Sequence, residues 1–269
     1  MEIAEFPTLT AATFHRRMDS GKSRPALLQC IDATGADTGS YVVKLLGAME
    51  FKETAFICEF MAYHLANLLG IPVPEAAIIA IEKDFVAALP DLEMKRLFEM
   101  SLGLNFATKF KSPGFSTWPI GKPIPRNIFQ ACAEIFAFDA LIQNPDRRGD
   151  NPNLLWSEEE VFAYDHEAAF SFIFSIDRSI RENPSSNLSA KNLEFLKNHI
   201  FFNGLRKQSI NYNRMEEAMT AVGPATIKDI QGQIPEGWKN QCLDSILRYT
   251  EAMCKTPTIL TKPIKEILA

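Results

Sequence analysis

The spacing of apolar residues divides the first part of the chain into strands and one long helix. Residues 27–31 and 41–46 are apolar runs on either side of a turn of small residues, which predicts a strand, a turn and a second strand. Over residues 56–69, apolar side chains recur every three or four positions, and this period is typical of an amphipathic helix. Gly70 and the two prolines that follow it predict the end of that helix.

A second helix is predicted over residues 128–142, which are strongly apolar and lead directly into a loop rich in Asn, Asp, Pro and Gly. Two short apolar runs, residues 154–156 and 161–164, then flank an acidic turn and predict a hairpin. Such a hairpin folds back on itself, so we expect Asp165, which follows it, to lie beside the loop.

Polar side chains around the hairpin have the order that protein kinases require. Asp146 precedes Asn151 with four residues between them, and Asp165 follows the hairpin. In kinases the first acid meets the acceptor hydroxyl, while the amide and the second acid hold Mg²⁺ at the nucleotide phosphates. Mg²⁺ prefers oxygen ligands and takes few protein carboxylates. Asn153 is the competing amide, and the spacing favours Asn151. The alternative is a loop whose Asn and Asp side chains only form turns.

The second predicted strand contains one cation, Lys44. A lysine in an apolar strand is costly to bury without an anionic partner. Nucleotide phosphates and a glutamate of the following helix would be such partners, with Glu59 favoured and Glu53 as the second candidate. Gly35 and Gly39 lie in the preceding turn, where backbone N–H groups could approach phosphate closely. The alternative is a hairpin whose lysine simply reaches water.

Five segments occur in the order found in one known family. They are Tyr41-Val-Val-Lys44, the helix end Leu-Leu-Gly70-Ile-Pro-Val-Pro74, Leu104-Asn-Phe106-Ala-Thr-Lys-Phe110, the stretch from Phe138 through Asp146-Arg to Asn151-Pro-Asn-Leu-Leu-Trp, and Tyr164-Asp165-His. Together they resemble the HipA-like kinases, bacterial serine/threonine kinases whose best-known members are toxins of toxin–antitoxin pairs. The resemblance covers about residues 15–205. The Asp-Arg pair and the later Asp are also similar to phosphatidylinositol kinases.

The resemblance implies a role for each candidate residue. Lys44 would hold the nucleotide phosphates and Glu59 would orient it. Asp146 would be the catalytic base, and Asn151 and Asp165 would bind the metal. The hinge that meets the adenine through its backbone would include Phe106, Ala107 and Thr108.

The expected fold is α+β and two-lobed, like that of protein kinases. A small β-rich N-lobe with one helix, residues 1–104, would bind the nucleotide phosphates. A larger, mainly helical C-lobe, residues 105–269, would carry the catalytic loop and the metal site. Two features depart from the family: Arg148 stands where better-known members have a histidine, and the chain is much shorter than the full-length toxins. Both leave the toxin role and the protein target open.

Composition excludes several other classes of protein. The chain has 269 residues, 46% of them hydrophobic and 23% charged, as expected for a soluble globular protein. A formal net charge of −5 gives no basic surface for nucleic acid. No apolar run approaches the roughly 18 residues of a membrane span, and the start of the chain is not typical of a signal peptide. Five scattered cysteines favour a reducing, cytoplasmic location over a disulfide framework or a zinc site.

The sequence therefore predicts a phosphotransferase that depends on ATP and Mg²⁺. The acceptor would be a protein serine or threonine, or else a small-molecule or lipid hydroxyl. An antitoxin or regulatory protein is the partner that the resemblance implies. A different class is a pseudokinase that binds nucleotide without transfer, favoured by the lack of a G-x-G-x-x-G loop and by Arg148. A third is an interaction protein that uses its C-terminal helices.

Overall fold

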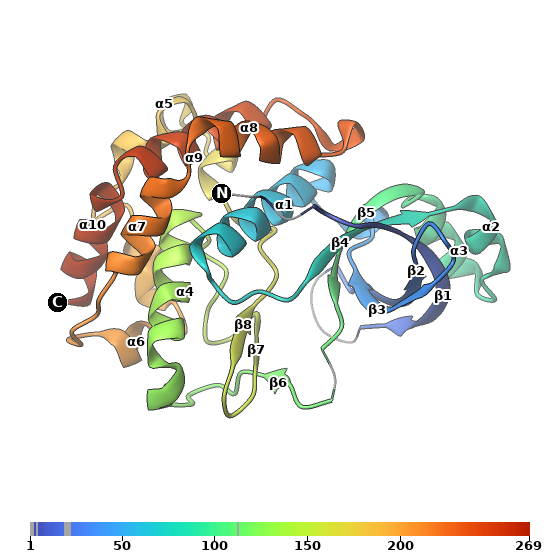
Figure 1. Ribbon diagram of the computed structural model, residues 1–269, viewed down its shortest axis with the longest axis horizontal. Helices are drawn as coiled ribbons and strands as arrows, with labels where there is room; N and C mark the ends of the chain where they lie inside the picture. Colours follow the sequence, from blue (N-terminus) through green and yellow to red (C-terminus); the bar gives the residue numbers. More distant parts are fainter. Residues whose placement is uncertain (1–2, 4, 19–22, 112) are drawn as a thin grey trace.

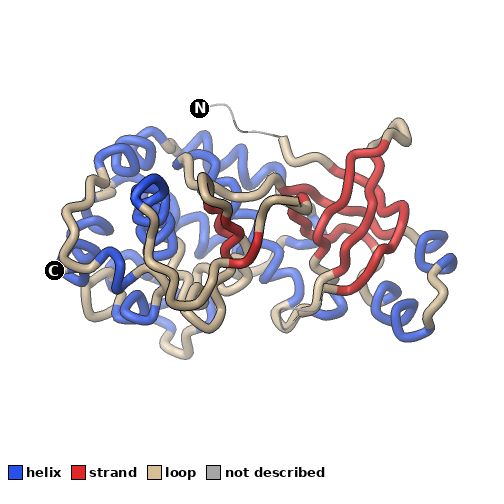
Figure 2. Tube along the Cα trace, turned by 90° about the horizontal axis from the view of Figure 1, so that it is seen from below, coloured by secondary structure: helices blue, strands red, loops and turns tan. Residues whose placement is uncertain are grey.

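The computed structural model describes residues 3, 5–18, 23–111 and 113–269, which form two unequal parts. A strand-rich barrel lies at one end of the molecule and a larger helical body at the other (Figure 1). Figure 2 shows the same division, with a small group of short strands between the barrel and the helices. Within the described ranges, no helix is long and apolar enough to cross a membrane.

Five strands close into the barrel in the order β1-β2-β3-β5-β4. Neighbouring strands are antiparallel except for β1 and β4, which run parallel where residues 8–10 pair with residues 78–80. The predicted strand–turn–strand is confirmed as β2 and β3, but β3 begins at Asp37, inside the predicted turn, and ends at Val43, before Lys44. The barrel strands are β1 (Thr8–Arg17), β2 (Ala26–Ile31), β3 (Asp37–Val43), β4 (Ala76–Ile81) and β5 (Gly103–Lys109).

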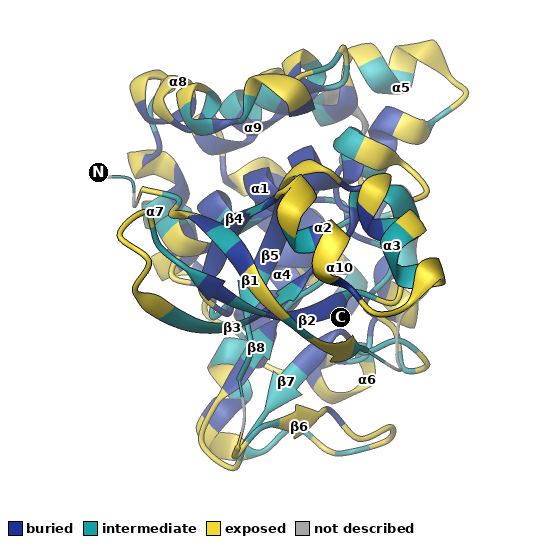
Figure 3. Ribbon diagram, turned by 90° about the vertical axis from the view of Figure 1, so that its right-hand side faces the viewer, coloured by how far each residue is buried: buried dark blue, intermediate teal, exposed yellow. Residues whose placement is uncertain are grey.

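The helical body consists of α1 and the chain from β6 onward, including a three-stranded sheet in the order β6-β7-β8. Figure 3 shows α1 and α4 as the buried elements of its interior. The predicted helix over 128–142 and the predicted hairpin are confirmed as α4 and as β7 and β8. The strands are β6 (Ser116–Thr117), β7 (Leu154–Trp156) and β8 (Val161–Ala163). The α-helices are α1 (Lys52–Leu69), α4 (Phe129–Leu141), α5 (Arg178–Glu182), α6 (Phe202–Leu205), α7 (Asn213–Ala221), α8 (Pro224–Gln233), α9 (Leu243–Lys255) and α10 (Thr258–Leu268). Short 3₁₀ segments are Leu46–Ala48, Arg126–Ile128, Ser171–Phe174, Pro184–Asn187, Glu194–Asn198 and Glu236–Trp238.

The sequence of β4 is apolar at every position because both of its faces are buried. Ala77 and Ile79 belong to the apolar core inside the barrel. Ala76 and Ile78 belong instead to the larger core that contains α1 and the C-terminal helices. Removing both faces of a strand from water gives a continuous apolar run instead of an alternating one.

Helix α1 ends as predicted at Gly70, which has the left-handed φ of 68° that glycine adopts without strain. Its buried side chains share one apolar core with α4 and α9, and the rings of Phe56 and Trp238 lie 5.0 Å apart between centroids. The prediction of a one-helix N-lobe is therefore corrected in two ways. α1 is anchored in the helical body, and α2 (Lys83–Ala88) and α3 (Leu92–Glu99) lie at the far end of the barrel (Figure 1). The predicted lobe boundary after residue 104 falls inside β5.

Candidate active site

The loop after α4 is fastened to the helical body by a buried ion pair. Arg147 Nε donates to Asp139 Oδ2 at 2.6 Å, and neither side chain is exposed to solvent. His199 Nε2 lies 3.0 Å from the same oxygen, and its Nδ1 accepts the Phe201 N–H. These partners require a neutral ring with its proton on Nε2, and burial lowers the pKa of His199 accordingly. His199 is therefore a buried histidine whose two ring nitrogens both have partners.

Arg147 also joins the two ends of the β7–β8 hairpin. Its Nη1 donates to the carbonyl of Asn153, just before β7, and to the carbonyl of Tyr164, just after β8. The Tyr164 N–H donates in turn to the Asn153 carbonyl at 3.1 Å. Asp165 follows at once with a φ of 60°. It lines the same cavity as Asn151, as the hairpin predicted.

The two candidate amides have different surroundings. Asn151 Nδ2 donates to Asp146 Oδ2 at 2.7 Å, so the Asn151 oxygen is the part of this amide that can meet a cation. Asn153 is buried, has a φ of 46°, and its Nδ2 has no hydrogen-bond partner within the described part of the chain. The geometry favours Asn151 as the metal ligand and gives Asn153 a backbone role through Arg147.

We expect Asn151→Ala to raise the Mg²⁺ concentration needed for nucleotide binding by about tenfold or more, as for the loss of groups that orient a metal site. Asn153→Ala should have the smaller effect on Mg²⁺, because its carbonyl remains in place. Titration of Mg²⁺ at fixed ATP, followed by thermal stabilisation, compares the two variants. A larger Mg²⁺ shift for Asn153→Ala would reverse the assignment.

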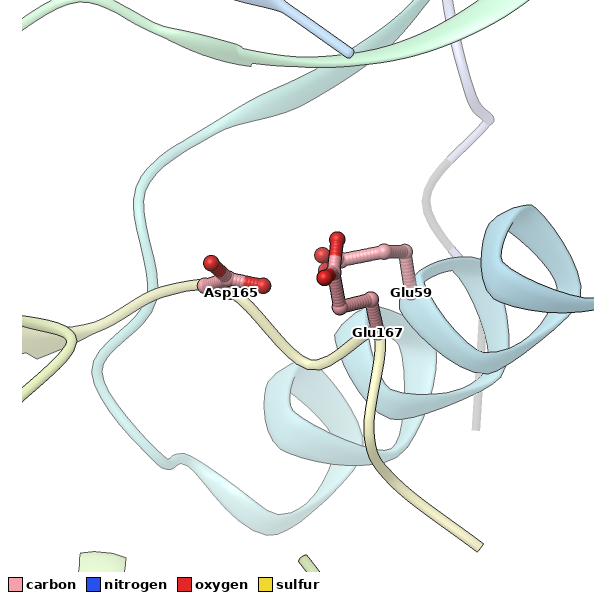
Figure 4. A group of neighbouring side chains, drawn as sticks. All are labelled: Glu59, Asp165 and Glu167. Atoms are coloured by element: carbon pink, nitrogen blue, oxygen red, sulfur yellow. The ribbon is translucent and has the colours of Figure 1, made fainter. Parts of the chain in front are cut away.

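Lys44, directly after β3, contacts three carboxylates. Its Nζ lies 2.5 Å from Glu59 Oε1, 2.6 Å from Asp165 Oδ1 and 3.0 Å from Glu167 Oε2. Figure 4 shows these carboxylates approaching from α1 and from the segment after β8. The four side chains are called the charge cluster. Glu59, and not Glu53, is the helix partner of Lys44. The sequence analysis did not identify Glu167 as a partner of Lys44. Its position two residues after Asp165, a predicted metal ligand, could have indicated this contact.

Burial and neighbouring charges have opposite effects on the pKa values in the charge cluster. Burial alone would lower the pKa of Lys44, but Asp165, Glu59 and Glu167 raise it well above its ordinary value. Burial alone would raise the pKa of Glu59, but Lys44 and the nearby His166 lower it to about 2. For Glu167, burial raises the pKa and Lys44 offsets the rise only in part. The cluster therefore places three acidic side chains around one lysine.

A cavity of about 440 Å³ lies between the barrel and the helical body and is lined in part by the charge cluster. From the connection between β1 and β2, the described residues Met18, Ser23 and Pro25 line it. Gly35 and Gly39 are outside this lining, because the β2–β3 turn lies at the opposite end of β2 from Pro25. The two glycines therefore do not line the cavity that we assign to the nucleotide.

The predicted hinge residues Phe106, Ala107 and Thr108 lie inside β5, which pairs with both β3 and β4. Their backbone groups are committed to the barrel, since a central strand shares its donors and acceptors with two neighbours. The side chains of Phe106 and Thr108 line the cavity, whereas Ala107 belongs to the barrel core. The Phe110 N–H still donates to a carbonyl of β3. Backbone contact with a base is therefore expected only from the Phe110 carbonyl and Lys111 onward.

Arg148 places a positive charge beside the candidate catalytic acid. Its Nη2 lies 3.9 Å from Asp146 Oδ1, and its Nε lies 3.1 Å from Asp150 Oδ1. The backbone of Arg148 forms a β-bridge with His199, so the position of this residue is fixed even though its side chain is partly exposed. The departure from histidine therefore changes the charge next to Asp146 without loosening the loop.

An acid bound to an amide, a second acid behind a hairpin and a lysine–glutamate pair beside one interlobe cavity are the parts of a protein-kinase-like site. This arrangement defines the class of protein as one with a kinase-like fold and site. Residues 12–265 match the HipA-like kinase family, and the chain belongs to this family.

One solved structure with the same overall fold is the crystal structure of the proinflammatory kinase CtkA from Helicobacter pylori. The TM-score is 0.52 at 14% sequence identity, and the alignment covers 98% of this chain and 99% of that one. At this identity the similarity shows the fold alone. A search of curated proteins found no match.

Proposed function

We propose that the protein is an active kinase that transfers the γ-phosphoryl group of ATP to a hydroxyl group in the presence of Mg²⁺. The observation that carries the proposal is the convergence of two sets of side chains on one cavity. Asn151, which is hydrogen-bonded to Asp146, and three members of the charge cluster all line it. Kinases need these groups together because transfer depends on positioning and on neutralising phosphate charge.

Each side chain would have a defined part in the transfer. Asp146, whose side chain is 34% exposed, is open to an acceptor and would take the hydroxyl proton. The hydroxyl oxygen would then bond to the γ-phosphorus as the bond to the β-phosphate oxygen breaks and ADP leaves. Lys44 would face the phosphates, and Asn151 and Asp165 would offer oxygens to Mg²⁺. Mg²⁺, when bound, supplies charge neutralisation at the phosphates.

The nature of the acceptor rests on family membership. We propose a protein serine or threonine, with a small-molecule hydroxyl as the alternative, and an antitoxin or another regulatory protein as a partner. A cytoplasmic location is part of the proposal, and the five cysteines, none of which is in a disulfide, support it.

A pseudokinase is the second candidate, since Lys44 engages Asp165 Oδ1, an oxygen that a metal would need. Incubation with labelled ATP and Mg²⁺, alone and with host lysate, separates the two. Label on this protein or on a lysate protein supports the active kinase and identifies the acceptor. Nucleotide binding without any transfer supports the pseudokinase.

Lys44→Met should abolish the thermal stabilisation that ATP and Mg²⁺ give to the wild type. The ammonium is the cation of the charge cluster, and methionine keeps its length without its charge. The variant should also unfold at a lower temperature without ligand, because three carboxylates lose their shared partner. Lys228→Met, at an exposed position of α8, is the matched control. Equal ATP-induced shifts in Lys44→Met and the wild type would contradict the role of Lys44.

A further inference from the structure

Glu167 is a third acid at Lys44, where a kinase site needs only two. The lysine–glutamate pair and the metal-binding aspartate are accounted for by Glu59 and Asp165. Glu167 nevertheless accepts a hydrogen bond from Lys44 Nζ at 3.0 Å, and its side chain is 29% exposed. One oxygen from each of the three acids lies within 4.8 Å of the others.

The third acid changes the charge balance of the site. One ammonium faces three carboxylates, so two negative charges are in excess at a place that is largely shielded from solvent. An excess of this kind attracts a divalent cation and repels phosphate, and both forces are stronger here than in water. With two acids, only one negative charge would be in excess.

The third acid also gives Lys44 a carboxylate partner in addition to Glu59 and Asp165. Asp165 Oδ1 is bound to Lys44 at 2.6 Å, so a metal at this carboxylate competes with the lysine for its negative charge. Glu59 alone would then hold an ammonium that must stay aligned with the phosphates. With Glu167 on the other side, Lys44 retains two carboxylate partners when Asp165 turns away.

We propose that Glu167 is a positioning residue of the phosphate-transfer site. It holds Lys44 while Asp165 binds the metal, and its charge makes nucleotide binding depend on a divalent cation. The inference rests on the proposed function, because it takes Asp165 as the metal ligand.

Glu167→Gln tests this inference, since it removes the charge and keeps the shape. Binding of Mn²⁺ without nucleotide, followed by the loss of the free-ion electron paramagnetic resonance signal, should weaken by about tenfold. Binding of ATP in EDTA, measured by calorimetry, should instead tighten by about threefold as one repulsive charge is removed. A purely structural role would not move the two affinities in opposite directions.

Two further variants are the controls. Glu167→Asp keeps the charge and should bind Mn²⁺ within about threefold of the wild type, even if Glu167→Gln proves unstable. Glu159→Gln, in the exposed turn between β7 and β8, should leave both affinities unchanged. Equal Mn²⁺ affinities of Glu167→Gln and the wild type, or a parallel loss of Mn²⁺ and ATP binding, would overturn the inference alone. A wild type that binds neither Mn²⁺ nor ATP would overturn the proposed function and the inference with it.

Discussion

Asp146→Asn should lose phosphoryl transfer and retain ATP binding. A positioned base contributes about 10²–10⁴-fold to rate, and asparagine cannot take the hydroxyl proton at neutral pH. The substitution keeps an oxygen that can accept the Asn151 Nδ2–H, so the bond that aligns this amide, 2.7 Å in the wild type, survives. Transfer of label from ATP measures the loss, and calorimetric titration with ATP and Mg²⁺ measures binding.

The matched control is Asp229→Asn, at an exposed position of α8 remote from the cavity. It should transfer phosphate at the wild-type rate. A fall of less than about tenfold in Asp146→Asn would mean that proton transfer to this acid contributes little, and that positioning by the metal and the lysine carries the reaction. Transfer by neither the wild type nor the variant, with equal ATP binding, would favour the pseudokinase.

Arg147→Leu should have the largest effect on stability, about 3–5 kcal/mol, which is typical when one partner of a buried ion pair is removed. Asp139 would then keep its charge in a place with no exposure, and the carbonyls of Asn153 and Tyr164 would lose a donor. Burial alone would raise the pKa of Asp139, but Arg147 and His199 hold it well below its ordinary value. A depressed pKa stabilises the fold above the unfolded-state pKa and ceases to do so in acid. The free energies of unfolding of Arg147→Leu and the wild type should therefore be compared by urea unfolding at neutral pH.

The double variant Asp139→Leu, Arg147→Leu is the control for this explanation. Because it removes both charges, it should recover part of the lost stability, as buried ion pairs often do when both partners become apolar. It should not recover all of it, since the two carbonyls of the hairpin remain without their donor. A double variant no more stable than Arg147→Leu would mean that the carbonyls, and not the uncompensated Asp139, account for the loss.

The features that could be predicted from the sequence are those that depend on residues close to one another along the chain. The period of apolar residues placed α1 and its end at Gly70, and two short runs around an acidic turn placed the hairpin that returns Asp165 to the loop. The order of Asp146 and Asn151 likewise indicated the chemistry, because these two residues belong to one tight loop.

The features that could not be predicted depend on contacts between distant segments. Closure of the barrel requires residues 8–10 to pair in parallel with residues 78–80, and the exposed, polar positions of β1 gave no sign of that partner. From the sequence, Arg147 could equally be a surface arginine. Only the structure shows that Asp139 of α4 lies beside it. The pairing of residues 106–108 could not be predicted for a similar reason, because only the closed barrel shows that both edges of β5 are occupied.

The anchorage of α1 in the helical body makes the contact between Lys44 and Glu59 a bridge between the two parts of the molecule. The helix is tied to the C-terminal chain by its apolar face and by the hydrogen bond from Asn240 Nδ2 to Thr54 Oγ1, 2.9 Å long. Glu59 therefore belongs to the helical body, whereas Lys44 directly follows a strand of the barrel. Any tilt of the barrel that widens the cavity stretches the contact between these two side chains, and any tilt that narrows the cavity restores it. The separation of Lys44 and Glu59 therefore reports how the barrel is placed relative to the helical body.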